Sequence, residues 1–438
     1  MRRAANMSES VILFGVFVVL LLCNVPIAVS LGVPAVLSCL VAGYSPSMLP
    51  INAYAATHKF SLLAIPFFIV SGNIMEKAGI SEKLINLASA CVGHFRSGLA
   101  LVTVICSCFF AAISGSGPAT VAALGTILIP AMAAAGYPIS FGAALMAAAG
   151  AIGVIIPPSV TFIVYGSISG ASVGRMFMAG VIPGIMMGIA LAICSMILTK
   201  KMDIKLRPRA SSHERWVAFK DAIWALLMPV IILGGIYGGI FTPTEAAAVS
   251  AVYGLIVGVF IYRKMDFREF IRCIVDSMAQ NGQVLFVMVC ASLFAWMVAT
   301  TGMTVKIGNA LISLSNDNLI IFLLITNVIL LFAGCIMDAN SALYILVPIL
   351  LPVATQLGYD QVAFGILMCV NLAIGLITPP VGVNLYTACS IAKISMRDII
   401  KWVLPLIAFL LIVLLLVTYI PQISLFLPHL MSPTAAAC

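Results

Sequence analysis

The chain has 438 residues, of which 63% are hydrophobic and only 8% are charged, and its mean hydropathy is +1.20. These values exclude an ordinary water-soluble globule and indicate an all-α polytopic membrane protein. The formal net charge of +8 comes from basic residues gathered in a few loops, so it reports membrane topology rather than a nucleic-acid partner. The 12 cysteines are scattered through apolar runs and predict neither a disulfide framework nor a metal site.

The N-terminal segment begins with Arg2-Arg3 and continues as an apolar run, which resembles a signal peptide. No small-residue cleavage site closes the run and further apolar segments follow, so we interpret it as a first membrane span. Residues 11–41 are long for one span and short for two, with the expected break at Asn24-Val25-Pro26. The number of crossings here stays open.

A short segment of small and polar residues interrupts the apolar segment that starts near Gly98; it reads Ser114-Gly115-Ser116-Gly117-Pro118. A second apolar arm follows it and ends at Pro130. Two half-length arms that meet at such a tip are too short for two crossings, each of which needs about 20 residues. We therefore predict a re-entrant helical hairpin over about residues 113–133.

The next apolar segment, about residues 141–167, contains Gly153-Val-Ile-Ile-Pro157-Pro158. Proline removes a backbone donor and clashes with the preceding turn, so two in a row break a helix. In hydrocarbon such a break is tolerated where the backbone is buried in protein or lines a watery cavity. The segment is predicted to be a broken helix at a binding site; the alternative is a simple kink in a packed helix.

The same motif returns 222 residues later as Gly375-Leu-Ile-Thr378-Pro379-Pro380. This offset also aligns Pro130 with Pro352 and Gly136-Tyr137 with Gly358-Tyr359. Pro and Tyr are not residues that apolar helices share by composition alone, so the chain is two copies of one unit. The second copy is predicted to hold a hairpin at about 336–356, with Asp338 and Asn340 at its tip, and a broken helix at about 361–390. Paired, interrupted apolar segments point to the binding site of a secondary transporter.

The charge of the loops predicts the orientation of the two copies. Residues 200–220 carry seven basic residues and are assigned to the cytoplasm: Lys200, Lys201, Lys205, Arg207, Arg209, Arg215 and Lys220. The helix at about 178–198 ends at this loop, whereas its counterpart at about 400–420 starts beside Lys393 and Arg397. The copies are therefore predicted to be inverted. The domains are residues 1–199, a basic loop with a linking helix pair at 200–272, and residues 273–438, whose tail from 421 is expected outside the cytoplasm.

Asp338 is the one carboxylate deep within an apolar segment, where a charge is costly and usually functional. One hypothesis is a Na+ site built from Asp338, the hydroxyls of Ser114, Ser116 and Thr378, and carbonyls freed at Gly153 and Gly375. The other is that Asp338 caps the second arm of its hairpin, and the two are compatible. Free amides at the hairpin tips would also favour an anionic substrate group.

Two further motifs are given structural rather than chemical roles. Glu245, in Phe241-Thr-Pro-Thr-Glu245, is predicted to cap the start of a helix. Gly115-Ser116-Gly117 would suit an intramembrane serine protease only with a histidine base nearby. All four histidines fall in polar or terminal segments, which disfavours an enzyme.

Taken together, the tip at 114–118, the Gly153 and Gly375 motifs and the Phe241–Glu245 link resemble the large membrane subunit of TRAP (tripartite ATP-independent periplasmic) transporters, the DctM-like permeases. The resemblance spans essentially the whole chain. It implies an elevator-type secondary transporter of the bacterial inner membrane that imports organic acids, such as C4-dicarboxylates, sialic acid or sugar acids, with Na+ as the coupling ion and no other cofactor.

The resemblance also implies two partners, a small four-helix membrane subunit and a periplasmic substrate-binding receptor, and we expect neither to be fused to this chain. A receptor-independent anion carrier of similar build is the alternative. No catalytic residue is expected, and the residues placed at the ion and substrate site are Ser114, Gly115, Ser116, Gly117, Pro118, Gly153, Pro157, Pro158, Asp338, Asn340, Gly375, Thr378 and Pro379.

Overall fold

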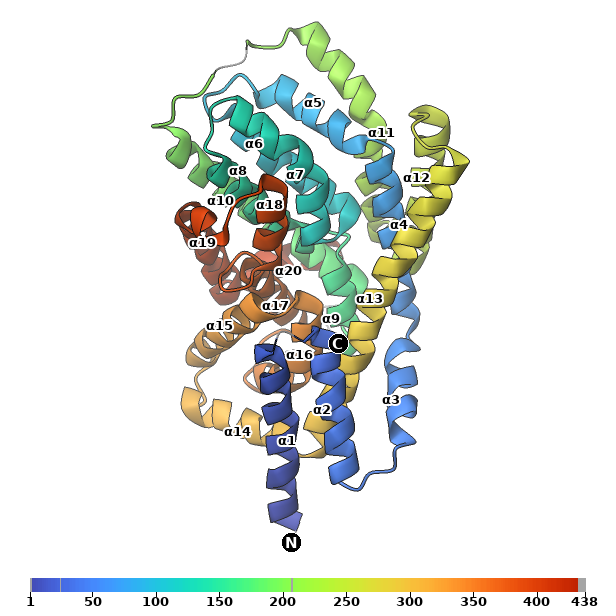
Figure 1. Cartoon of the computed structure of the whole chain (residues 1–438), viewed down its shortest axis with the longest axis vertical. Coiled ribbons are helices and arrows are strands. Elements are labelled where there is room, and N and C mark those ends of the chain that lie inside the picture. Colours follow the sequence, from blue (N-terminus) through green and yellow to red (C-terminus); the bar gives the residue numbers. More distant parts are fainter. Residues whose placement is uncertain (1, 24, 206–207, 432–438) are drawn as a thin grey trace.

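The computed structural model describes residues 2–23, 25–205 and 208–431, with side chains from Glu9 onward. Every regular element in this part of the chain is a helix, which confirms the predicted all-α class (Figure 1). Asn24 at the predicted N-terminal break, Arg207 of the basic loop and the tail beyond Met431 lie outside the described residues.

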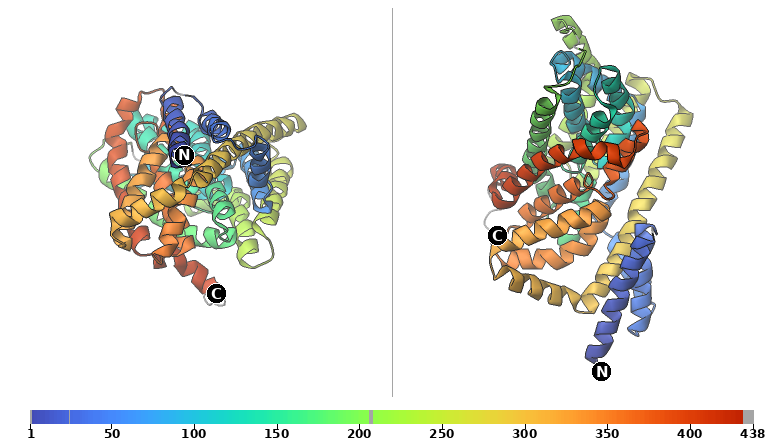
Figure 2. Two further views of the ribbon diagram at one scale, coloured as in Figure 1. Left: turned by 90° about the horizontal axis from the view of Figure 1, so that it is seen from below. Right: turned by 60° about the vertical axis from the view of Figure 1, so that its left-hand side comes forward.

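The N-terminal region forms α1 (Arg2–Leu22), α2 (Ile27–Val41) and α3 (Met48–Thr57). Residues 11–41 are thus two helices, which meet where the sequence places a break. Helix α2 packs along α1 and along α13 (Phe267–Thr300), which also contacts α3. At 34 residues, α13 is the longest helix described, and it runs along one side of the whole molecule (Figures 1 and 2).

A second group of helices surrounds the upper part of α13. It contains the 3-10 turn η1 (Phe60–Leu63), α4 (Ala64–Lys77), α11 (Ser212–Tyr237) and α12 (Pro243–Ile256), which continues as a π-turn over Val257–Ile261. Helix α4 packs on both α12 and α13. The start of α12 is a capping box: the Thr242 N–H donates to Glu245 at 2.8 Å, and the Glu245 N–H donates to Thr242 Oγ1 at 3.3 Å. The predicted capping role of Glu245 is confirmed.

The sequence repeat is matched by a repeat of helices. Helix α7 (Gly117–Ala134) and α16 (Ala339–Gln356) correspond residue for residue at the offset of 222. Other pairs agree within a few residues: α5 (Ile80–Val92) with α14 (Met303–Ser315), α6 (Gly98–Ser114) with α15 (Leu319–Ile336), α8 (Ile139–Ala151) with α17 (Gln361–Gly375), α9 (Val160–Ser169) with α18 (Val383–Ala392), and α10 (Val173–Thr199) with α19 (Met396–Tyr419).

The hairpin arms are longer than the half-length arms that the sequence led us to expect. Helix α6 has 17 residues, and α7, α15 and α16 have 18 each. At 1.5 Å per residue these helices are about 26 Å long, close to the thickness of the hydrocarbon core. Arm length alone therefore does not distinguish a re-entrant arm from a crossing.

The second half of the broken helix in each copy packs against the other copy. Helix α9 of the first copy packs on α16 of the second, while α18 of the second copy packs on α7 and α8 of the first. Figure 1 shows α18 lying beside α7 and α8, and α9 reaching down toward α16. The last helix, α20 (Gln422–Met431), packs on α10. Each hairpin is thus completed by a helix from the other copy.

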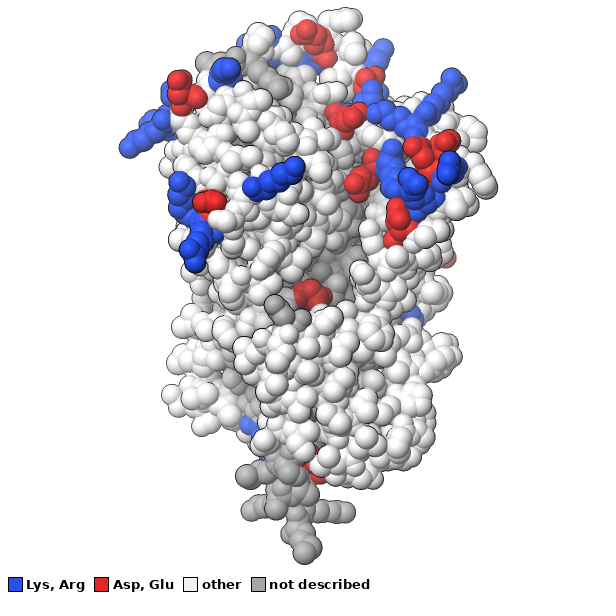
Figure 3. Space-filling model, in the orientation of Figure 1, with Lys and Arg blue, Asp and Glu red and all other residues white. Residues whose placement is uncertain are grey.

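By length and composition, nine of the described helical segments could cross a membrane, and seven shorter apolar helices accompany them. In Figure 3 most Lys and Arg side chains on the visible face lie toward one end of the molecule. Among the described residues, three ion pairs join neighbouring segments: Lys77–Asp276 at 3.0 Å, Lys83–Asp221 at 3.0 Å and Lys264–Glu82 at 2.7 Å. This distribution is that of a multi-pass membrane protein with one strongly charged face.

Candidate substrate and ion site

The first hairpin tip, residues 114–118 and called tip 1 here, gathers several oxygen atoms. Ser114 Oγ lies 2.9 Å from Thr120 Oγ1, and Thr120 Oγ1 donates to the Ser116 carbonyl at 2.8 Å. Gly115 makes the turn with φ of +60°, a conformation that favours glycine. Hydroxyl and carbonyl oxygens of this kind are hard ligands of the type that oxygen-binding cations use.

The start of α7 leaves backbone donors free. Ser116 is its N-cap residue but makes no side-chain capping bond. Pro118 has no N–H, and the N–H groups of Gly117 and Ala119 have no acceptor within the described part of the chain. Gly117, Pro118 and Ala119 all line the same cavity. The positive end of the α7 dipole therefore faces open space.

The first helix break, residues 152–159 and called break 1, is pressed against tip 1. A Cβ atom on Gly153 would lie 2.8 Å from both the Ser116 carbonyl oxygen and Thr120 Oγ1, so only glycine fits there. The Val160 N–H donates to the Gly115 carbonyl at 3.4 Å. Gly153 thus allows the break to approach the oxygen cluster of tip 1.

The second tip, residues 337–341 and called tip 2, is organised by Asp338. Its carboxylate accepts the N–H groups of Asn340 and Ser341, each at 3.1 Å, and also the Ser341 hydroxyl. Asp338 is therefore the N-cap of α16, the structural role proposed for it as an alternative.

The second break, residues 376–382 and called break 2, is pressed against the first arm of its own hairpin. A Cβ on Gly375 would lie 2.5 Å from Gly334 Cα, and the Val381 N–H donates to the Cys335 carbonyl at 3.3 Å. Thr378 Oγ1 donates at 2.8 Å to the carbonyl of Ile374, which lies in the last turn of α17. The Pro157–Pro158 and Pro379–Pro380 peptide bonds, one in each break, are both cis.

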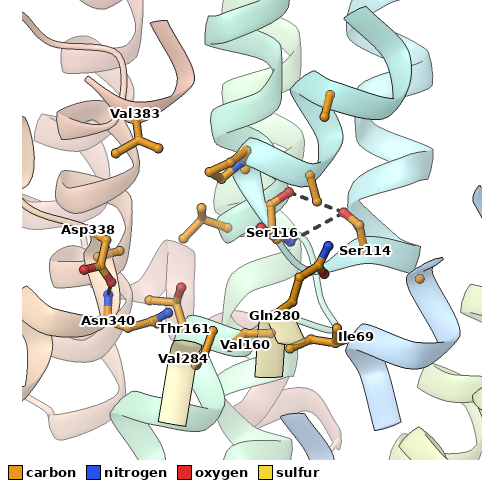
Figure 4. Close-up of a pocket in the computed structure, with 18 of the residues that line it drawn as sticks. Ile69, Ser114, Ser116, Val160, Thr161, Gln280, Val284, Asp338, Asn340 and Val383 are labelled. Carbon is orange, nitrogen blue, oxygen red and sulfur yellow. Dashed lines mark hydrogen bonds between the residues drawn. The ribbon is translucent and has the colours of Figure 1, made fainter. Parts of the chain in front are cut away.

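A cavity of about 590 Å³ lies between the two tips. Figure 4 shows Ser114 and Ser116 on one side of it and Asp338 and Asn340 on the other. The hollow in the middle of the face shown in Figure 3 contains an acidic side chain. The sequence-predicted residues that line the cavity are Ser114, Gly115, Ser116, Gly117, Pro118, Asp338 and Asn340. Six others lie in or directly next to the breaks and not in this lining: Gly153, Pro157, Pro158, Gly375, Thr378 and Pro379.

The cavity has a third wall, from α4 and α13, that the sequence reasoning did not identify. Asn73 donates to Gln280 Oε1 at 3.1 Å and to Ser277 Oγ at 2.9 Å, and Gln283 and Glu76 lie on the same wall. The available signal was the group of polar residues within 276–283, which precedes the long apolar part of α13. Placing that run opposite the tips requires the tertiary structure.

Asn384, at the start of α18, was also missed. It is completely buried, its Nδ2 donates to Ala147 O of α8 at 3.1 Å, and its amide lies against Gly117. It therefore braces the second break against tip 1. A lone Asn just after a Pro-Pro break was the only sequence signal.

Comparison with known proteins decides the family. A family model described as the tripartite ATP-independent periplasmic transporter, DctM component, matches residues 14–423. The chain belongs to the DctM family. DctM proteins are the large permease subunits of TRAP transporters, so the site described above lies in a transport protein.

Several relatives in the family are closely similar. The chain is 46% identical over 421 residues to the isethionate TRAP transporter permease protein DctMQ of Oleidesulfovibrio alaskensis, covering 95% of this chain and 66% of that protein. It is 40% identical over 442 residues to the C4-dicarboxylate TRAP transporter large permease protein DctM of Rhodobacter capsulatus, covering 97% and 99%. It is 39% identical over 372 residues to the sialic acid large permease SiaM of Vibrio cholerae, covering 85% and 87%.

A solved structure shares the fold at low sequence identity. The YdaH transporter of Alcanivorax borkumensis superimposes with a TM-score of 0.60 at 16% identity, covering 85% of this chain and 87% of that one. This similarity concerns the arrangement of helices only.

Proposed function

We propose that this DctM-family chain is the substrate-carrying subunit of a Na+-coupled TRAP transporter in a bacterial inner membrane. It imports an organic acid anion that a periplasmic receptor delivers, and it works together with a small four-helix membrane subunit. Relatives are named for C4-dicarboxylates, sialic acid, isethionate and 2,3-diketo-L-gulonate, all of them organic acids.

The observation that carries the proposal is the convergence of both tips on one cavity. Tip 1 and tip 2 hold matching positions in the two copies, and each is buttressed by its own break. Broken or re-entrant segments from two inverted repeats that meet near the membrane midplane are the construction of secondary transporters. We infer that the copies are inverted and that the hairpins move together as an elevator against the group of α4, α11, α12 and α13.

Na+ coupling is supported by the oxygen cluster of tip 1. Ser114 Oγ, Thr120 Oγ1 and the Ser116 carbonyl converge beside Gly153, where the break leaves room for nothing larger than glycine. At tip 2, Asp338 can bind a cation through lone pairs that its capping bonds leave free. We propose one ion at each tip, with unlike ligands.

The proposal is tested in proteoliposomes that contain the chain and its small subunit, with an inward Na+ gradient. Little uptake of the receptor's ligand is expected until purified receptor is added outside, and dissipating the Na+ gradient should stop it. Robust receptor-free uptake at micromolar substrate would favour the self-sufficient anion carrier instead. Uptake that is indifferent to Na+ would contradict the coupling.

A further inference from the structure

The cavity between the tips contains more negative than positive side chains. Glu76 and Asp338 line it, and no Lys, Arg or His is found among its lining residues in the described ranges. Lys77, the cation next to Glu76 in the sequence, is paired with Asp276 at 3.0 Å and does not line the cavity. An anionic substrate must therefore bind through backbone groups, neutral donors or co-bound cations.

The two tips differ in what their helix N-termini can offer an anion. At tip 2 the amides of Asn340 and Ser341, in the first turn of α16, already bind the Asp338 carboxylate, so the positive end of this helix is compensated. At tip 1 the N–H groups of Gly117 and Ala119 have no acceptor among the described residues and face the cavity. A helix N-terminus of this kind binds a carboxylate or sulfonate.

Tip 1 has a second feature that points to a ligand. Asn384 is completely buried against Gly117, and its Oδ1 has no hydrogen-bond donor within the described part of the chain. A buried acceptor of this kind normally has a partner, because leaving it unpaired costs free energy. Tip 1 thus offers donors to an anionic group in the cavity, and Asn384, which lies behind Gly117 and outside the cavity lining, provides an unpaired acceptor beside it.

The lining of the rest of the cavity is polar and includes no Lys, Arg or His side chain among the described residues. Asn73, Gln280 and Gln283 form the α4–α13 wall, and Thr161 also lines the cavity. Asn340 Oδ1 is buried without a donor among the residues described. These amides and hydroxyls match uncharged hydroxyl, carbonyl or amide groups of a substrate. A second anionic group would instead meet the exposed carboxylate of Glu76.

We propose, on the basis of the transport function proposed above, that the site takes an organic monoanion and discriminates against dianions of the same length. The single carboxylate or sulfonate binds at tip 1, and uncharged polar groups bind along the α4–α13 wall. Two like charges roughly 8 Å apart at an effective dielectric constant of about 20 repel enough to weaken binding about 30-fold. Glu76 is the source of most of that discrimination, because the charge of Asp338 is compensated by its amides.

The test uses matched pairs of acids that differ by one charge: succinamate against succinate, and gluconate against glucarate. Dissociation constants are measured by calorimetry on the purified full-length chain in detergent with saturating NaCl. The monoanion of each pair should bind about 30-fold more tightly than the dianion. Glu76→Gln should reduce this ratio to less than about tenfold, whereas Glu82→Gln, which removes a carboxylate outside the cavity, should leave it unchanged.

The possible results separate the inference from the function on which it rests. Equal or tighter binding of the dianions overturns the monoanion preference and leaves organic-acid transport in place. A preference that persists in Glu76→Gln, or that falls equally in Glu82→Gln, overturns the role of Glu76. Binding of none of the four acids, with or without Na+, contradicts the organic-acid site itself.

Discussion

The two hairpin tips occupy matching positions of a repeated unit, yet their atoms are used differently. At tip 1 the Ser116 side chain leaves the helix uncapped, so amides and oxygens stay available. At tip 2 the Asp338 carboxylate accepts the amides of Asn340 and Ser341, and Ser341 is the equivalent of Ala119 at tip 1. The repeat therefore preserves the backbone framework and varies the chemistry, which is how two copies of one unit can bind unlike ligands.

In both copies a glycine at the helix break packs closely against the backbone of the hairpin. Gly153 lies against the Ser116 carbonyl and Gly375 lies against the Gly334 backbone, and in each case a Cβ would approach backbone atoms within 3 Å. Backbone cannot rotate away as a side chain can. The framework common to both copies should accordingly tolerate substitution less well than the side chains that differ.

The largest effect is expected for Gly375→Ala. The added methyl group would lie 2.5 Å from Gly334 Cα, so break 2 must separate from its hairpin. We expect a loss of about 3 kcal/mol, at the upper end of the cost of overpacking, together with loss of uptake. Thermal unfolding in detergent and proteoliposome uptake measure the two effects. Gly282→Ala is the control, since nothing lies within 4 Å of its Cβ, and a Gly375→Ala protein as stable as that control would refute the shared framework.

A more selective change is Asp338→Asn at tip 2. Asn caps a helix about as well as Asp, so the fold should be kept while the charge is removed. If the carboxylate binds Na+, half-maximal uptake should need at least roughly tenfold more Na+, a loss of about 1.4 kcal/mol of ligand binding, or uptake should fail. Unchanged Na+ dependence would leave Asp338 as a helix cap only.

The corresponding change at tip 1 is Thr120→Val. It removes the hydroxyl that bonds Ser114 Oγ and the Ser116 carbonyl while keeping the shape of a fully buried side chain. The Na+ concentration that gives half-maximal uptake should rise about fivefold, because roughly 1 kcal/mol of polar interaction is lost. Thr126→Val, in the same helix but away from the tip, serves as the matched control. The same shift in both variants would remove tip 1 from the ion site.

The smallest effect is expected away from both tips, at the Lys264–Glu82 pair. A hydrogen bond from Lys264 and its charge lower the pKa of Glu82. A carboxyl with a lowered folded-state pKa contributes stability above its unfolded pKa and loses it as the pH falls through the folded value. Because the pair is exposed, the contribution should be below about 1 kcal/mol. Thermal unfolding of wild type and Glu82→Gln should differ slightly at pH 7 and converge near pH 3; a constant difference would mean that the pair is not responsible.

The sequence predicted those parts of the structure that depend on local signals or on the repeat. The breaks were predicted from the Pro-Pro pairs, the first tip from its Ser, Gly and Pro residues, and the start of one helix from the Thr242–Glu245 capping box. Each of these signals acts locally, because it changes the backbone conformations or hydrogen bonds that are available at that residue. The seven site residues that line the cavity are those at the tips themselves.

Other features depend on contacts between distant segments and were not predictable. The packing of α9 on α16, the brace from Asn384 and the wall with Gln280 all join residues more than a hundred positions apart, and apolar periodicity carries no information about such partners. The length of the hairpin arms was underestimated, because glycine and serine near the tips are compatible with helix in a tightly packed interior.

The central claim is that tip 1 and tip 2 form one site, and labelling of single cysteines tests it most directly. Ala119→Cys and Asn340→Cys, each in a cysteine-free background, place a thiol on either side of the cavity. In oriented proteoliposomes both should react with an impermeant maleimide from the same side of the membrane, and Na+ together with a bound organic acid should protect both. Reaction from opposite sides, or protection of only one thiol, would contradict a single site shared by the two tips.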